Sequence, residues 1–198
     1  QNITLNVDMA DFTPPNLPNG GSAPYYNDRI IAHEMVHAEM SRSMDFNSLP
    51  NWFKEGAAEL IHGADERVKN DYNGGAGWAA MIAAFNADSV AASAGYSAGY
   101  TAMRYMHDKI KAAGGAGVKD VMTYLSQNAG STLDQALTNA SHGAFANLAG
   151  FQASFQANGN SYVAAMNLTN ADTGAIGGLD ADGGPSLSAT DIMLDRGE

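Results

Sequence analysis

Apolar residues recur at helical spacing over most of the chain, and this pattern predicts a mainly α-helical protein. The clearest helix is expected over residues 27–42, where Val36 and Met40 fall one turn apart on an apolar face. Pro50 is well placed in the first turn of a second helix, over 51–62. Further helices are expected over about 78–86, 98–112, 118–127, 133–139 and 144–156, with a short one over 162–166.

The two ends of the chain depart from this helical pattern. Residues 2–8 alternate polar and apolar side chains, which predicts a half-buried strand. Residues 12–24 contain four of the six prolines and are expected to form a loop. We therefore expect an α+β fold that is predominantly α-helical, with one domain over residues 1–169. Residues 170–198, rich in Gly and Asp, are expected to form an extended tail that packs on the domain or links onward.

Composition and charge exclude several functional classes. The chain has 198 residues, of which 45% are hydrophobic and 16% charged, as in folded proteins. Its 21 acidic and 10 basic residues give a net charge of −11, which disfavours binding to nucleic acid. The absence of cysteine excludes a disulfide scaffold, thiolate catalysis and a Cys-ligated metal. The longest apolar run, residues 78–85, is too short to cross a membrane.

The strongest chemical signal is an HExxH motif at residues 33–37. His33 and His37 are one helical turn apart, so both imidazoles can bind one metal ion. Glu34 lies beside them and can take a proton from water bound to the metal. Zinc suits two imidazoles and one carboxylate, with a fourth position left open. The alternative interpretation is two histidines on a helix face that bind no metal.

A second segment, NWFKEGAAEL, supplies the carboxylate that such a site needs. Glu55 lies 18 residues after His37, enough for the first helix to end and a second to return, and is the predicted third ligand. Glu59, one turn further, is expected to accept the outer N–H of a ligating imidazole; the alternative is an exposed charge. Gly56 indicates backbone crowding, which we expect to be against the metal-binding helix.

HEMVHA followed by LPNWFKEGAAELIHGADERV resembles the gluzincin metallopeptidases, whose third zinc ligand is a Glu on a following helix. The match is closer to the bacterial collagenase group. It is closer still to the flagellinolysins, metallopeptidase domains inserted in the variable region of some bacterial flagellins, to which the tail DTGAIGGLDADGG is more loosely similar. The resemblance implies a zincin-like fold, zinc bound by His33, His37 and Glu55, and Glu34 as the general base.

The segment YSAGYTAMRY resembles the gluzincin pattern in which a Tyr three residues before a Gly faces the zinc. The resemblance gives Tyr96 the role of hydrogen-bond donor to the oxyanion, with Tyr100 as its rival. The alternative is that both are packing aromatics. Gluzincins also place a β-rich lobe before the zinc helix. Here fewer than 30 residues precede it, so we expect a minimal N-terminal strand region over a helical lobe.

Weaker signals concern histidines and aspartates outside the motif. The histidines without ligand spacing, given no role, are His62, His107 and His142. The aspartates in Gly-rich turns that could gather around Ca²⁺, or form ordinary Asp-Gly turns, are Asp172, Asp180 and Asp182.

The expected function is a zinc-dependent endopeptidase that acts on extracellular protein or peptide substrates. The resemblance to flagellinolysins implies a place in a bacterial flagellar filament, outside the cell. A zinc aminopeptidase shares the same core but needs a pocket for the substrate amine, for which we find no motif. A catalytically silent display domain that keeps zinc for stability is the third hypothesis; the intact Glu34 argues against it.

Overall fold

The computed structural model describes residue 6 and residues 27–168, and in this part of the chain every regular element is a helix. The elements are α1 (Asn27–Ser43), η2 (Phe46–Ser48), α2 (Asn51–His62), α3 (Asp65–Tyr72), η3 (Asn73–Gly75), α4 (Trp78–Asn86), α5 (Ser93–Ala112), α6 (Val118–Gln127), α7 (Leu133–Ala140) and α8 (Leu148–Ala165). Among these helices, none has the length and apolar character that a membrane crossing requires. The prediction of a predominantly helical protein is confirmed.

Several predictions from the sequence fall outside the described residues. The strand expected over 2–8 is one of them, since Asn6 alone is described there and has no regular structure. The tail from residue 170 is another. The candidate calcium ligands belong to that tail: Asp172, Asp180 and Asp182.

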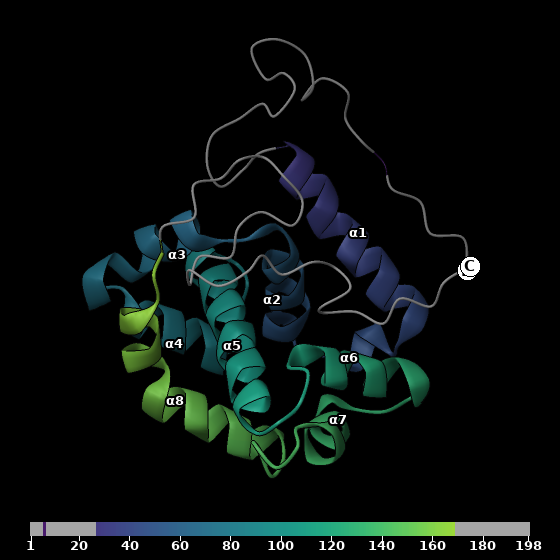
Figure 1. Cartoon of the computed structure of the whole chain (residues 1–198). Helices are drawn as coiled ribbons and strands as arrows, with labels where there is room; N and C mark the ends of the chain where they lie inside the picture. The colour runs from purple at the N-terminus through teal and green to yellow at the C-terminus, as the bar shows by residue number, and fades with distance from the viewer. Residues whose placement is uncertain (1–5, 7–26, 169–198) are drawn as a thin grey trace.

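Helix α5 lies at the centre of the fold (Figure 1). All of its residues from 97 to 107 are buried. Its most extensive contact is with α2, and α3, α4, α6 and α8 also pack on it. Helix α1 packs on α2 on the other side. The two helices that carry the predicted metal ligands are therefore adjacent, and α2 is held between α1 and the core.

The contact between α2 and α5 depends on two glycines that face each other. A Cβ at Gly56 would lie 2.4 Å from the carbonyl oxygen of Gly99 and 2.8 Å from Met103 Cγ. A Cβ at Gly99 would lie 2.6 Å from the carbonyl oxygen of Trp52. The crowding expected at Gly56 is present, but the expected partner was wrong, because the neighbour is α5 and not the metal-binding helix.

Aromatic packing anchors the start of α2. The Trp52 ring stacks on Phe151, with ring centroids 5.3 Å apart, and lies 5.0 Å from Phe85. The backbone N–H of Trp52 also donates to Asp88 Oδ1 at 2.9 Å. These contacts fix the first turn of α2 and therefore the position of Glu55, which begins the next turn.

The predicted bounds of α2, α4 and α6 agree with the structure, whereas α3 was not predicted. In α3 the apolar pattern is sparse: Val68 and Tyr72 are its only buried apolar side chains. The remaining sequence signal for this helix is the acidic pair in its first turn, Asp65 and Glu66, because the helix dipole favours negative charge there.

Two other helices are longer than predicted and run through glycines. Helix α5 begins at Ser93 and not at 98, and a single helix, α8 (Leu148–Ala165), is present where two helices were predicted over 144–156 and 162–166. A Cβ at Gly95 would lie 2.2 Å from the carbonyl oxygen of Ser89. At Gly95 the helix packs closely against another part of the backbone, and the sequence pattern alone does not show which part that is.

Candidate metal centre

Helices α1 and α2 bring three potential metal ligands together. His33 Nε2 lies 2.9 Å from Glu55 Oε2, and His37 Nε2 lies 3.2 Å from the same oxygen. The two Nε2 atoms are 3.1 Å apart. Because both histidines come from successive turns of α1, only the packing of α2 on α1 is needed to close the triangle.

These distances fit a tetrahedral metal site. Ligands bound to zinc at about 2.0–2.1 Å with tetrahedral angles are separated by about 3.3 Å. His33, His37 and Glu55 have their donor atoms at nearly this spacing and form a group that could hold a metal ion. Two imidazoles and one carboxylate are also a donor set that zinc prefers.

The carboxylates around His33 control its protonation when no metal is bound. Burial lowers the pKa of His33, but hydrogen bonds to Glu55 and Glu59 outweigh burial and raise the pKa to about 9. Burial raises the pKa of Glu55, but hydrogen bonds from His33 and His37 outweigh it and lower the pKa to about 2. At neutral pH a metal ion must therefore displace a proton from His33.

We expect zinc binding to release about one proton from His33 per ion near pH 7, and affinity to fall about tenfold per pH unit below pH 9. Above pH 9 the imidazole is already neutral, so this release stops. Isothermal titration calorimetry with zinc, in buffers of different ionisation enthalpy, measures the protons released. Binding at pH 7 without proton release would contradict the assigned protonation of His33.

Glu59 lies behind His33, on the side away from Glu55. Its Oε1 is 3.3 Å from His33 Nδ1, and the side chain is only 1% exposed. Burial raises the pKa of Glu59, but hydrogen bonds from His33 and His62 outweigh burial and hold the pKa well below its usual range. An ionised Glu59 accepts the Nδ1–H of His33, which leaves Nε2 of that ring free to bind a metal.

His62 is a member of the site that the sequence analysis left without a role. Its Nε2 lies 3.3 Å from Glu59 Oε1, and Arg29 Nε donates to its Nδ1 at 3.3 Å. The sequence feature that could have identified His62 is its spacing of three residues from Glu59, which places both side chains on one helix face. His33, Glu59 and His62 could also hold a metal ion. The guanidinium of Arg67 contacts Glu59, however, so this second group is less suited to a divalent cation than the first.

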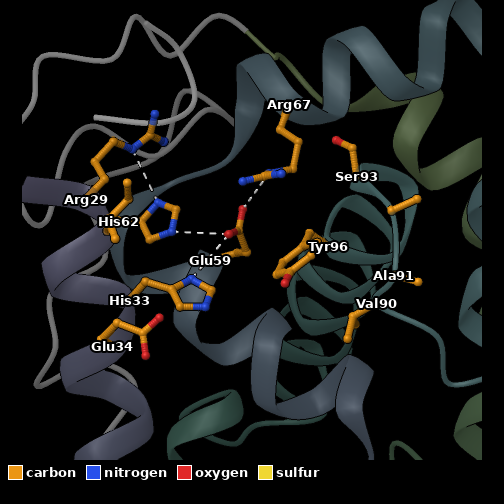
Figure 2. A pocket seen from close by; sticks show the side chains of 12 residues that line it. Arg29, His33, Glu34, Glu59, His62, Arg67, Val90, Ala91, Ser93 and Tyr96 are labelled. Atoms are coloured by element: carbon orange, nitrogen blue, oxygen red, sulfur yellow. Dashed lines mark hydrogen bonds and ion pairs between the residues drawn. The ribbon is translucent and has the colours of Figure 1, made fainter. Parts of the chain in front are cut away.

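A cavity of about 380 Å³ opens beside His33 (Figure 2). Helix α1 forms one wall, α2 and α3 contribute buried charged groups, and the segment entering α5 forms the opposite wall. The residues that line it are Arg29, Ile30, His33, Glu34, Glu59, His62, Arg67, Val90, Ala91, Ala92, Ser93 and Tyr96. Glu34 is exposed here, directly after His33 on α1. A solvent-exposed carboxylate therefore borders the same cavity as the candidate metal ligand His33.

The structure distinguishes between the two tyrosines considered for the oxyanion. Tyr96 is half-buried, lines the cavity and has its ring 6.2 Å from that of His33. Burial and the negative charges of Glu55 and Glu59 raise the pKa of Tyr96, so its phenol stays protonated at neutral pH. Tyr100 is buried, and its hydroxyl donates to Asp65 Oδ1 at 3.2 Å. Of the two, Tyr96 faces the site and Tyr100 packs in the core.

The remaining histidines serve local contacts elsewhere. His107 Nδ1 accepts from the backbone N–H of Val118 at 3.4 Å, and His142 Nε2 lies 3.0 Å from Asp120 Oδ2. Neither lines the cavity.

Compared with protein-family models, curated proteins and solved structures, the chain has no match. Its functional interpretation therefore depends on the chemistry of this site. One member of a three-donor group for a divalent cation, His33, lines the same cavity as the exposed carboxylate of Glu34 and the phenol of Tyr96, an arrangement suited to hydrolysis of a carbonyl substrate.

Proposed function

We propose that this protein is a zinc-dependent endopeptidase that hydrolyses peptide bonds in extracellular proteins. The observation that carries the proposal is the convergence of His33, His37 and Glu55, of which His33 lines a cavity together with Glu34 and Tyr96. Hydrolysis of a peptide bond needs a Lewis acid, a base and a donor to the oxyanion. His33, Glu34 and Tyr96, one residue for each of these three elements, line the same cavity.

A bound zinc ion would polarise the scissile carbonyl and make water easier to deprotonate. In this mechanism, Glu34 takes the proton of the attacking water and passes it to the leaving amine. The hydroxyl of Tyr96 donates a hydrogen bond to the oxygen on which negative charge develops. Glu59 keeps His33 in one tautomer throughout the reaction.

Localisation and biological setting are proposed from the motifs alone. HEMVHA and LPNWFKEGAAELIHGADERV resemble the flagellinolysins, which supports an enzyme carried on a bacterial flagellar filament and acting on proteins outside the cell. The low share of charged residues, 16%, and the lack of cysteine are compatible with that setting.

The test is a protease assay on purified protein with an unfolded protein as substrate. We expect hydrolysis that a zinc chelator stops and added zinc restores. A peptide with a blocked N-terminus and its free counterpart should both be cut internally. Cleavage of the free peptide alone would favour an aminopeptidase, and zinc binding with no hydrolysis would favour a silent display domain.

Tyr96→Phe should lower kcat by about 10- to 1000-fold with little change in KM, because it removes one donor to the oxyanion and leaves the cavity shape intact. Tyr100→Phe is the matched control, since Tyr100 contacts buried Asp65 and not the cavity. Steady-state kinetics on the folded variants measure both effects. An unchanged kcat in Tyr96→Phe would remove Tyr96 from the mechanism.

A further inference from the structure

Arg67, on α3, lies between Glu59 and Tyr96 (Figure 2). Its Nε donates to Glu59 Oε2 at 3.0 Å. Its guanidinium carbon lies 5.1 Å from the centre of the Tyr96 ring. The residue is only 8% exposed, so most of its side chain is shielded from bulk water.

These contacts complete a circuit of four residues from four helices. Glu59 Oε1 lies 3.3 Å from His33 Nδ1, and the Tyr96 ring lies 6.2 Å from the His33 ring. Arg67 joins the two ends, since it contacts Glu59 on one side and Tyr96 on the other. The candidate ligand His33 is thus connected to the ring of Tyr96 through the carboxylate of Glu59 and the guanidinium of Arg67.

Arginine is the side chain that suits this position. A guanidinium can donate from its edge to a carboxylate while its face packs on an aromatic ring, which a lysine ammonium cannot do in the same geometry. A cation over an aromatic ring is attracted by the negative face of the ring, more strongly when water is excluded. Burial and the carboxylates of Glu55, Glu59 and Glu34 raise the pKa of Tyr96, and the positive charge of Arg67 opposes them.

We propose that Arg67 is a positioning residue for catalysis: anchored on Glu59, it holds the Tyr96 ring in the orientation from which the phenol donates to the oxyanion. This inference rests on the proposed peptidase function. Arg67 is not among the three candidate metal donors His33, His37 and Glu55. Its effect on the reaction depends on Tyr96. If Arg67 only joined α3 to α2, its effect would not depend on Tyr96.

A double-mutant cycle between Arg67 and Tyr96 tests this dependence. Arg67→Met should lower kcat about tenfold with KM changed less than about threefold. In the Tyr96→Phe background the same substitution should change kcat by less than about twofold, because the group that it positions is gone. A tenfold loss in both backgrounds would overturn the proposal. Arg67→Lys, which keeps the charge but not the planar contact, provides the same comparison if Arg67→Met does not fold.

A second measurement does not depend on activity. The chain has eight tyrosines, and labelling with 3-fluorotyrosine gives each a fluorine NMR signal. The Tyr96 signal is assigned by its loss in Tyr96→Phe. Arg67→Lys should shift or broaden this signal more than that of Tyr124 on α6, and an unchanged Tyr96 signal would overturn the proposal. Absence of zinc-dependent hydrolysis in the wild type would instead refute the proposed function, while the NMR comparison would still test the contact.

Discussion

Glu34→Gln is expected to lower kcat/KM by about 1000-fold while the protein still binds one zinc ion per chain. Glutamine has nearly the same shape as glutamate but cannot accept a proton, so the substitution removes the base and keeps the packing. Glu34 is exposed at the cavity, and the three-donor group consists of His33, His37 and Glu55. The variant therefore separates catalysis from metal binding.

Zinc content by metal analysis and hydrolysis of an internally quenched peptide measure the two properties separately. Glu39→Gln is the matched control, because Glu39 is another carboxylate of α1 and does not line the cavity. It should retain activity close to the wild type. Retained activity in Glu34→Gln would refute the general-base role, and loss of zinc would show that Glu34 supports the metal site.

Gly56→Ala is expected to lower the free energy of unfolding by about 3 kcal/mol, since it forces a methyl group into a closely packed contact. The new Cβ would lie 2.4 Å from the carbonyl oxygen of Gly99, a backbone atom that cannot move without shifting α5. Helix α2 would have to move away, and Glu55, the preceding residue, would move with it. We therefore expect weaker zinc binding together with the loss of stability.

Urea unfolding followed by circular dichroism measures the change. Gly150→Ala is the matched control: it also lies in a helix, and its Cβ would meet only Asn147 Oδ1 at 3.4 Å and Ala146 Cβ at 3.9 Å. Without a clash, alanine should leave stability unchanged or raise it by about 0.5 kcal/mol. Equal effects of the two substitutions would contradict the close helix contact at Gly56.

Local spacing predicted the part of the site that depends on helix geometry. His33 and His37 face the same way because they are one turn apart, and Glu55 and Glu59 do so for the same reason. Whether the group binds zinc stays a prediction. The bounds of α2 also agree with its apolar pattern and with Pro50 before it.

Contacts between elements could not be predicted in the same way. The partner of Gly56, the choice of Tyr96 over Tyr100, and the places of His62 and Arg67 all depend on how α2, α3 and α5 pack together. Helix α3 itself was missed, and with it Arg67, because its few apolar residues give little periodicity.

The sequence by itself therefore determined that the protein is mainly helical and that its helices carry a histidine pair and an acid pair at one-turn spacing. The tertiary structure decided that the histidine pair and the acid pair meet. It also decided that the ring of Tyr96 lies near that of His33 and that the buried Arg67 packs on Tyr96. The physical reason is the difference between local geometry and contacts that are long-range along the chain. A helix repeats its geometry every few residues, so spacing along the chain reports which side chains share a face. The meeting of two faces depends on close packing among residues far apart in the chain, and no local pattern records it.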